Sequence, residues 1–295
     1  MPDKPMPDNK FIDVSKILKE KAPGLNKWLP GFVKSYLKRK LHEDEINNIM
    51  HELKDVYGLE YNNKGLEMMG ANVESVNSHN IPKEGGIILA SNHPLGGLDG
   101  IAFVKAIGEV RKDVHFVVND VLKNLENYGD VFLGVNKIRS PSHRSLRSIE
   151  SVLMTDESIG FFPAGLVSRK KNGVIYDLDW KKSFVTQAID HDRLIVPAFI
   201  EGKNSNFFYR FANIRKRIGI QFNIEMLLLP DEMFNQRGHT IKVHFGKPFD
   251  PNVVLDKSKK HKEWADYIKQ YIYSPDFMKE IPFEEYIKNN PLVKD

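Results

Sequence analysis

From about residue 75 onward, short apolar runs alternate with amphipathic segments, and this alternation limits the possible folds more than any other feature of the sequence. The apolar runs are rich in β-branched and aromatic residues and predict strands, while the segments between them have the helical period. The predicted strands are 86–92, 114–119, 130–135, 158–163, 193–200 and 240–246, and the predicted helices are 100–110, 142–154, 180–190 and a basic stretch near Ile214. Strands separated by helices of this length predict an α/β fold, with a mixed sheet flanked by helices.

Two flanking segments lack this alternation. Before residue 75, "EDEINNIMHELKDVYG" has helical periodicity and begins with an acidic turn, as a helix N-terminus prefers. After residue 250, "KEWADYIKQYI" predicts one helix, which is followed by a segment punctuated by proline. We therefore expect an N-terminal basic helical extension over 1–75, an α/β domain over 76–250 and a C-terminal helical segment over 251–295.

Composition narrows the cellular setting. The 295 residues include no stretch of about 18 apolar residues, which argues against an ordinary membrane-spanning helix. The start "MPDKPMPDNK" lacks the apolar core of a signal peptide, and the absence of cysteine means that nothing requires an oxidising compartment. A net charge of +4 is too small to indicate nucleic acid as a partner. We expect a cytoplasmic protein whose membrane contact is peripheral.

Positive charge is concentrated near the N-terminus. From Lys10 to Lys40, nine residues are basic and two are acidic, interspersed with aromatic and aliphatic residues. This combination suits an anionic lipid surface, where cations meet headgroups and aromatic rings enter the interface. It equally suits helices whose apolar stripe packs on the protein's own core while the lysines stay solvated. Both interpretations remain open, and Pro23-Gly24 and Pro30-Gly31 divide the segment into short helices.

The stretch "ILASNHPLGGLDG" carries the first candidate for catalysis. A strand runs into a turn that contains Pro94 and two glycines, and a helix follows from about Leu98. Catalytic groups of α/β sheets usually lie where strands end, and here His93 and Asp99 can face each other across the turn. A carboxylate on one ring nitrogen fixes the tautomer and leaves the other nitrogen free as a base. The alternative is a turn histidine whose hydrogen bonds are satisfied by backbone.

A second candidate stretch is "GFFPAGLVSRKKNG", over 160–173. A predicted strand ends at Phe-Pro, and a turn of small residues then presents Ser168 and three consecutive cations. Cations and backbone amides after a strand can hold a phosphate or a carboxylate. The alternative is a solvated basic loop.

Together these stretches resemble the glycerolipid acyltransferase superfamily, of the lysophospholipid (1-acylglycerol-3-phosphate) acyltransferase type. Four blocks over roughly 85–249 stand in that family's order: "NHPLGGLD", "GDVFL", "FPAGLVSR" and "LIVPAF". In the first block, Asn92, His93 and Asp99 match the family's Asn-His-x4-Asp motif. The resemblance implies transfer of a fatty acyl group from an acyl thioester, acyl-ACP or acyl-CoA, to the hydroxyl of a lysolipid. It implies a membrane lipid surface as a partner and no cofactor or metal.

The chain departs from the family pattern at several positions. Five residues separate His93 from Asp99 where the family has four, so the turn must bulge for the pair to meet. Ala164 and Val167 stand where the family has the Glu and Arg that bind glycerol phosphate, and the Asp-Arg that ends the second block is absent. We therefore expect an acceptor without glycerol phosphate, such as a lyso-ornithine or lyso-glycine lipid, with lysophosphatidic acid as the alternative.

The resemblance also implies roles for individual residues. His93 takes the proton of the acceptor as it attacks the thioester, and Asp99 orients His93. Oxyanion donors are expected among the amides of the glycine turn or near Gly165. The expected substrate-binding residues are Asn92, Gly96, Gly97, Lys137, Arg139, Gly165, Ser168, Arg169 and Lys170.

Two other functional classes are compatible with the sequence. The first is a metal-dependent hydrolase with His93 and Asp99 as ligands, although no His-Glu-x-x-His spacing is present and the other histidines are scattered singly. The second is a catalytically silent, membrane-associated lipid-binding protein that keeps the fold. An acyltransferase of this type is expected in the cytoplasm, peripheral on the inner face of the cell membrane.

Overall fold

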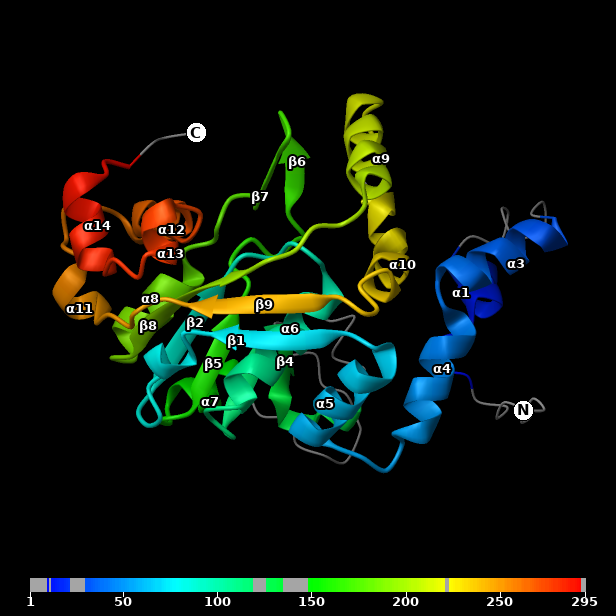
Figure 1. Cartoon of the computed structure of the whole chain (residues 1–295), viewed down its shortest axis with the longest axis horizontal. Helices are drawn as coiled ribbons and strands as arrows, with labels where there is room; N and C mark the ends of the chain where they lie inside the picture. Colours follow the sequence, from blue (N-terminus) through cyan, green and yellow to red (C-terminus); the bar gives the residue numbers. More distant parts are fainter. Residues whose placement is uncertain are drawn as a thin grey trace.

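A seven-stranded sheet forms the centre of the protein, in a computed structural model that describes residues 10, 12–21, 30–118, 126–134, 148–220 and 223–292 (Figure 1). The strand order across the sheet is β1-β9-β8-β2-β5-β3-β4. The strands are β1 (Asn72–Val76), β2 (Ile87–Ser91), β3 (Val114–Val118), β4 (Phe132–Gly134), β5 (Ser158–Phe161), β8 (Leu194–Ile200) and β9 (Thr240–Phe245). All neighbouring pairs are parallel except β8 with β9. The sheet is therefore mixed, and the predicted α/β class is confirmed.

The register brings three strand ends to one edge of the sheet. Leu89 of β2 pairs with Gly160 of β5 on one side and with Val196 of β8 on the other. Because these three strands are parallel, the segments that follow them leave from the same edge. That edge is where α/β proteins place their ligands.

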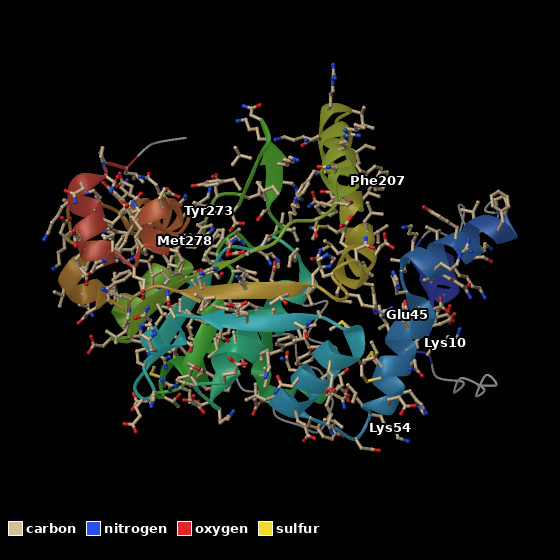
Figure 2. All side chains as sticks on the ribbon, viewed as in Figure 1. Lys10, Glu45, Lys54, Phe207, Tyr273 and Met278 are labelled. Atoms are coloured by element: carbon tan, nitrogen blue, oxygen red, sulfur yellow. The ribbon has the colours of Figure 1, made fainter. Side chains whose placement is uncertain are left out.

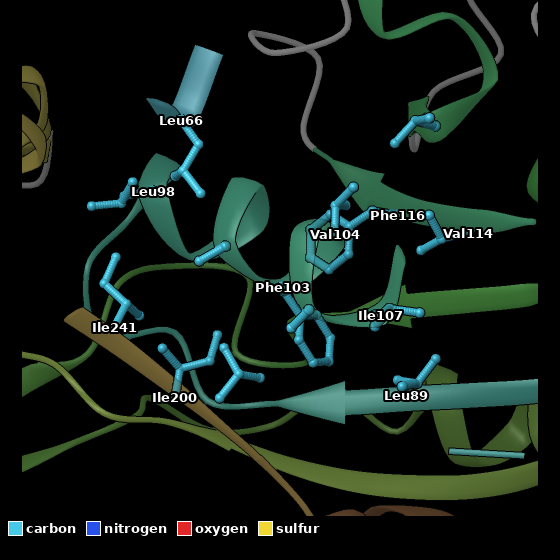
Figure 3. Packing of buried hydrophobic residues seen from close by; sticks show 14 of the residues in the cluster. Leu66, Leu89, Leu98, Phe103, Val104, Ile107, Val114, Phe116, Ile200 and Ile241 are labelled. Carbon is cyan, nitrogen blue, oxygen red and sulfur yellow. The ribbon is translucent and has the colours of Figure 1, made fainter. Parts of the chain in front are cut away.

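Helices cover both faces of the sheet. The longer ones are α5 (Gly58–Met69), α6 (Gly97–Gly108), α8 (Ser183–Asp190) and α12 (His261–Ile272). One apolar cluster lies under α5 and α6 and includes Phe103, Phe116 and Leu89 (Figure 3). A second cluster, on α8 and α12, includes Trp180 and Trp264. Burial on both faces explains why β2, with no exposed residue, reads as an uninterrupted apolar run.

The remaining short elements connect or close these layers. They are η1 (Ser78–Asn80), η3 (Glu126–Val131), α7 (Ile149–Leu153), η4 (Ile224–Leu228), α10 (Leu229–Phe234), α11 (Pro251–Val254), α13 (Pro275–Met278) and α14 (Phe283–Asn289). Residues 142–147 of the predicted helix 142–154 lie outside the described residues, and its described part contains α7. The Pro-punctuated tail folds into α13 and α14, and Phe283 and Tyr286 of α14 are buried in the second cluster.

The sheet begins earlier than the sequence indicated. Strand β1 lies inside the expected N-terminal extension and pairs with β9. The sequence did not predict this strand because "NVESV" is a short edge strand with no fully buried residue. Helix α5, also in that segment, places Tyr61, Leu66 and Met69 in the first core cluster. Only the part of the N-terminal extension that precedes α5 lies apart from the sheet.

The N-terminal helices are α1 (Val14–Lys21), α3 (Gly31–Lys40) and α4 (Glu43–Glu52), which confirms the prediction of a series of short helices. They are held together at the buried carboxylate of Glu43, which accepts hydrogen bonds from Lys10 Nζ and the Val14 amide. Lys40 Nζ bonds Asp231 of α10 at 2.8 Å and ties the group to the body of the protein. Helix α3 has no buried residue.

A two-stranded antiparallel hairpin stands apart from the main sheet. It consists of β6 (Arg169–Lys171) and β7 (Val174–Tyr176) and occupies the stretch that the sequence presented as a turn or a loop. The alternative interpretation, a solvated basic loop, missed this hairpin because a run of three cations has low strand propensity; the hairpin packs against α9 (Asn206–Arg217). Both elements project beyond the edge of the sheet (Figure 1).

Candidate active site

The turn after β2 brings His93 and Asp99 into contact despite the extra residue between them. Nδ1 of His93 lies 2.9 Å from Oδ2 of Asp99. Gly96 has a φ of +83°, an angle that residues with a side chain rarely adopt. A glycine at this position therefore allows the turn to hold the extra residue. Asp99 is the third residue of α6, and its carboxylate caps that helix. The structure thus produces the expected pair at the expected edge of the sheet.

The carboxylate of Asp99 is held by three donors. Besides His93 Nδ1, the amides of Leu95 (2.7 Å) and Gly96 (3.0 Å) donate to the same oxygen, Oδ2. Burial raises the pKa of Asp99, because the side chain is fully shielded from water, whereas these three hydrogen bonds favour the charged form. The two amides are therefore occupied, and the expectation that they stabilise an oxyanion does not hold for Leu95 and Gly96.

The side chain of His93 remains partly accessible. The ring stacks on Phe162 with centroids 4.2 Å apart, and 15% of the side chain is exposed. Among the described residues no hydrogen bond engages Nε2 of His93. Since Asp99 binds Nδ1, a protonated Nδ1 leaves Nε2 as an acceptor directed away from the carboxylate. This arrangement suits a general base.

A second buried carboxylate fixes the backbone of His93, and no pattern in the sequence pointed to it. Oδ1 of Asp177 accepts hydrogen bonds from the His93 amide at 3.1 Å and from Ser168 Oγ at 2.5 Å. Oδ2 accepts from Trp180 Nε1 at 2.8 Å. The amide of Ser168 in turn donates to the carbonyl of His93 at 2.8 Å. Asp177 thus joins the loop after β5 to the loop after β2.

Several residues predicted to bind substrate instead bind the protein's own groups. Asn92 is buried, and its side chain makes two hydrogen bonds to the backbone of Ile200, which fasten β2 to the end of β8. Arg169 donates to the buried Glu225 at 2.9 Å. Lys170 Nζ lies 3.0 Å from Oδ1 of Asn206. Lys137 and Arg139 lie outside the described residues.

The glycines of the site differ in surroundings. A Cβ at Gly96 would lie 3.0 Å from Leu229, whereas a Cβ at Gly97 would have no atom within 4 Å. Gly97 is the first residue of α6 and is partly exposed, so open space adjoins the helix N-terminus beside the dyad. Gly165 has a φ of +67°, and its amide donates a hydrogen bond to the carbonyl of Phe162. The nearest group to a Cβ there is Nζ of Lys181, at 3.4 Å.

Apolar side chains occupy the two positions where the family binds glycerol phosphate. Ala164 is buried, and Val167 is fully buried against Phe208 and Tyr209. In the part of the chain that the structure describes, no three His, Cys, Asp or Glu side chains gather to hold a metal ion. Nor is any described helix both long and apolar enough to cross a membrane.

Comparison with known proteins decides the family. A family model described as "Acyltransferase" matches residues 16–280. The chain belongs to this acyltransferase family. The resemblance drawn from the four sequence blocks is thereby confirmed, and the chain is an acyltransferase rather than a metal-dependent hydrolase or a silent lipid-binding protein.

Two curated relatives of this acyltransferase are named lyso-glycine lipid O-acyltransferase. The one from Bacteroides thetaiotaomicron is 44% identical over 264 residues, which are 89% of this chain and 97% of the relative. The one from Phocaeicola vulgatus is 42% identical over 89% of this chain and 94% of its own length. A crystal structure of the 1-acyl-sn-glycerophosphate acyltransferase PlsC from Thermotoga maritima aligns with 82% of this chain and 87% of its own, at 15% identity and a TM-score of 0.43.

Proposed function

We propose that this acyltransferase moves a fatty acyl group from an acyl thioester to the hydroxyl of a lyso-glycine lipid. The observation that carries the chemistry is the 2.9 Å contact between His93 Nδ1 and Asp99 Oδ2 at the end of β2, in a His93 side chain that stays 15% exposed. The names of the two relatives support the acceptor. Lyso-ornithine lipid is the second candidate acceptor, because it also lacks glycerol phosphate.

The acceptor follows from what the site lacks. An acceptor with a phosphomonoester needs cations that remain free to bind it. Val167 is apolar and buried, and Arg169 is already paired with Glu225. A lyso-amino-acid lipid carries no such phosphate and needs neither a guanidinium at 167 nor a free Arg169.

In the proposed reaction, Nε2 of His93 accepts the proton of the acceptor hydroxyl as its oxygen attacks the thioester carbonyl. Asp99 stabilises the imidazolium that results and holds its tautomer. When the tetrahedral intermediate collapses, the C–S bond breaks and the new ester remains. The proton passes from His93 to the departing thiolate. No covalent intermediate on the protein is needed.

The developing oxyanion needs donors other than Leu95 and Gly96. The amide of Gly97 is the first of α6, and amides in the first turn of a helix have no partner within the helix. A Cβ on Gly97 would meet no atom within 4 Å, so open space adjoins this residue, and the helix dipole adds positive potential there. We assign the oxyanion to this helix N-terminus.

The acyl donor in this proposal is an acyl-ACP or an acyl-CoA, and the protein works as a peripheral protein on the inner face of the cell membrane.

Parallel acceptor assays test this proposal. The purified protein is supplied with one long-chain acyl thioester and, in separate reactions, with lyso-glycine lipid, lyso-ornithine lipid or lysophosphatidic acid. We expect acylation of lyso-glycine lipid to exceed that of lysophosphatidic acid by at least about tenfold, which corresponds to about 1.4 kcal/mol in transition-state binding. Preference for lysophosphatidic acid would contradict the proposal.

A further inference from the structure

Helix α9 has two apolar faces, and the fold uses only one of them. Its buried face consists of Phe208, Tyr209 and Ala212. Its opposite face carries four apolar side chains at helical spacing: Phe207, Phe211, Ile214 and Ile218. Phe207 and Ile218 are each 64% exposed, and Phe207 stacks on Phe211 with centroids 6.1 Å apart. Large side chains in an exposed row of this kind mark an interaction surface rather than a scatter of single residues.

The same helix is strongly basic. Residues 203–220 include five Lys or Arg and no acidic residue. Arg215 pairs with Glu225 and holds the helix to the body of the protein. Arg210, Lys216 and Arg217 are exposed, and within the described ranges no carboxylate pairs with them. Arg210 and Arg217, seven residues apart, lie beside the exposed apolar row.

The β6–β7 hairpin extends this surface. Asn213 Nδ2 of α9 donates to the carbonyl of Lys170 at 3.2 Å, and Lys170 Nζ reaches Asn206. Lys171 and Val174 are exposed at the end of the hairpin. Hairpin and helix project from the same side of the molecule (Figure 1), and Figure 2 labels Phe207 on α9.

Both projecting elements begin at the catalytic turn. Asn204, just before α9, donates from Nδ2 to the carbonyl of Pro94 at 3.2 Å. Ser168, just before β6, donates its amide to the carbonyl of His93. The bases of both elements therefore lie at the turn that carries His93.

We propose that α9 and the β6–β7 hairpin form a docking surface for an anionic lipid bilayer, beside the dyad. Cations that flank a row of Phe and Ile suit the interface of a bilayer, where headgroups take the charges and acyl chains take the rings. A soluble acidic carrier protein would match the cations and leave the apolar row exposed. The docking itself is independent of the reaction, whereas its use as the entry route of the lysolipid rests on the proposed function.

Vesicle binding by the intact chain tests this surface. The vesicles contain phosphatidylcholine with or without phosphatidylglycerol, and the partition coefficient is measured by sedimentation. One variant, Phe207→Ser/Ile214→Ser/Ile218→Ser, replaces three of the four residues of the apolar row, and another, Arg210→Gln/Arg217→Gln, removes two flanking charges. We expect the first to lose at least about tenfold in partition, and the second about 25-fold on anionic vesicles at low salt, or about fivefold for each charge.

Matched controls make the result specific. Met154→Ser/Val253→Ser removes apolar side chains that are 71% and 80% exposed elsewhere, and Lys112→Gln/Lys257→Gln removes two exposed charges elsewhere. Both controls are expected to bind within about twofold of the parent. Binding of the α9 variants equal to that of the controls would overturn the proposal. It is also overturned if the α9 variants bind vesicles normally but lose a self-association or the binding of an acyl carrier protein.

The readouts separate docking from catalysis. With a water-soluble short-chain lysolipid and acyl thioester, the α9 variants are expected to keep turnover within about threefold of the parent, because no bilayer is involved. If vesicle binding depends on α9 but no lysolipid is acylated under any condition, the proposed function fails and the docking surface stands. If turnover on vesicles is unchanged in α9 variants that have lost vesicle binding, the entry route is wrong and the proposed function stands.

Discussion

Replacing Asp177 by asparagine tests whether this buried carboxylate positions His93. The side chain of Asp177 accepts three hydrogen bonds and donates none: the His93 amide and Ser168 Oγ share one oxygen, and Trp180 Nε1 uses the other. Asparagine keeps one oxygen and replaces the other by an NH₂ group. In either orientation at least one buried donor faces another donor.

The magnitude follows from that count. One buried donor left without an acceptor costs about 1–3 kcal/mol. For a chain of this size we expect the melting temperature to fall by roughly 2–12 °C, at about 2–4 °C per kcal/mol. A shift of about 1 Å in the position of His93 lowers turnover by up to about 10²-fold, even well below the melting temperature. Asp179→Asn is the matched control, since it is the same substitution at an exposed site two residues away.

A double variant checks the hydrogen-bond reasoning. Trp180→Phe removes the indole donor, so that in Asp177→Asn/Trp180→Phe the amide NH₂ no longer faces an N–H group. Although the single Trp180→Phe change itself costs packing, the double variant should be destabilised by less than the sum of the single ones, by about 1 kcal/mol. Melting curves and single-turnover rates measure both effects. Turnover of Asp177→Asn equal to that of Asp179→Asn, or strict additivity, refutes the positioning role.

Two further predictions concern the turn and the N-terminal helices. Gly96→Ala is expected to destabilise the protein by about 1–3 kcal/mol, because residue 96 has a positive φ and a Cβ there would contact Leu229. Gly97→Ala should leave the melting temperature unchanged and lower turnover by filling the oxyanion space. Equal melting temperatures of the two variants would contradict this. Phe32→Ser/Tyr36→Ser, on a helix with no buried residue, should weaken binding to anionic vesicles by about tenfold, and the remaining binding should fall further between 0.1 and 1 M salt. Unchanged binding would show that α3 adds nothing to the membrane contact made by α9.

The catalytic pair could be predicted from the sequence because its parts are local. His93 and Asp99 lie six positions apart on one strand-turn-helix unit, so a strand signal, a glycine turn and a helix signal suffice to bring them together. The bulge was also visible in the spacing. The spacing did not predict that the amides of Leu95 and Gly96 donate to Asp99, because the capping of α6 by Asp99 depends on the φ of Gly96.

Contacts between distant segments were not predictable. Asp177 reaches the His93 amide across 84 positions, and the "DLDW" stretch around it carries no motif. Arg169 read as a free cation because its partner, Glu225, lies 56 positions away. Asn92 read as a substrate ligand, although its amide holds two strands together. In each case a polar side chain is used by the fold, and a single sequence does not show which ones are.

The exposed row on α9 was hidden for a related reason. The basic stretch near Ile214 was predicted as a helix, and that prediction is confirmed by α9. With apolar side chains on both faces, however, the helical period does not tell which face the core covers. Only the contacts with β6 and η4 show that the face with Phe208 and Tyr209 is the buried one.

Turnover of His93→Ala tests the central claim most directly. The purified variant is assayed with lyso-glycine lipid and a long-chain acyl thioester, beside His51→Ala as a control at an exposed histidine. Removing a general base lowers the rate by about 10²- to 10⁴-fold, so we expect that loss for His93→Ala at an unchanged circular dichroism spectrum, and none for His51→Ala. A folded His93→Ala protein with turnover near that of the parent would contradict the account.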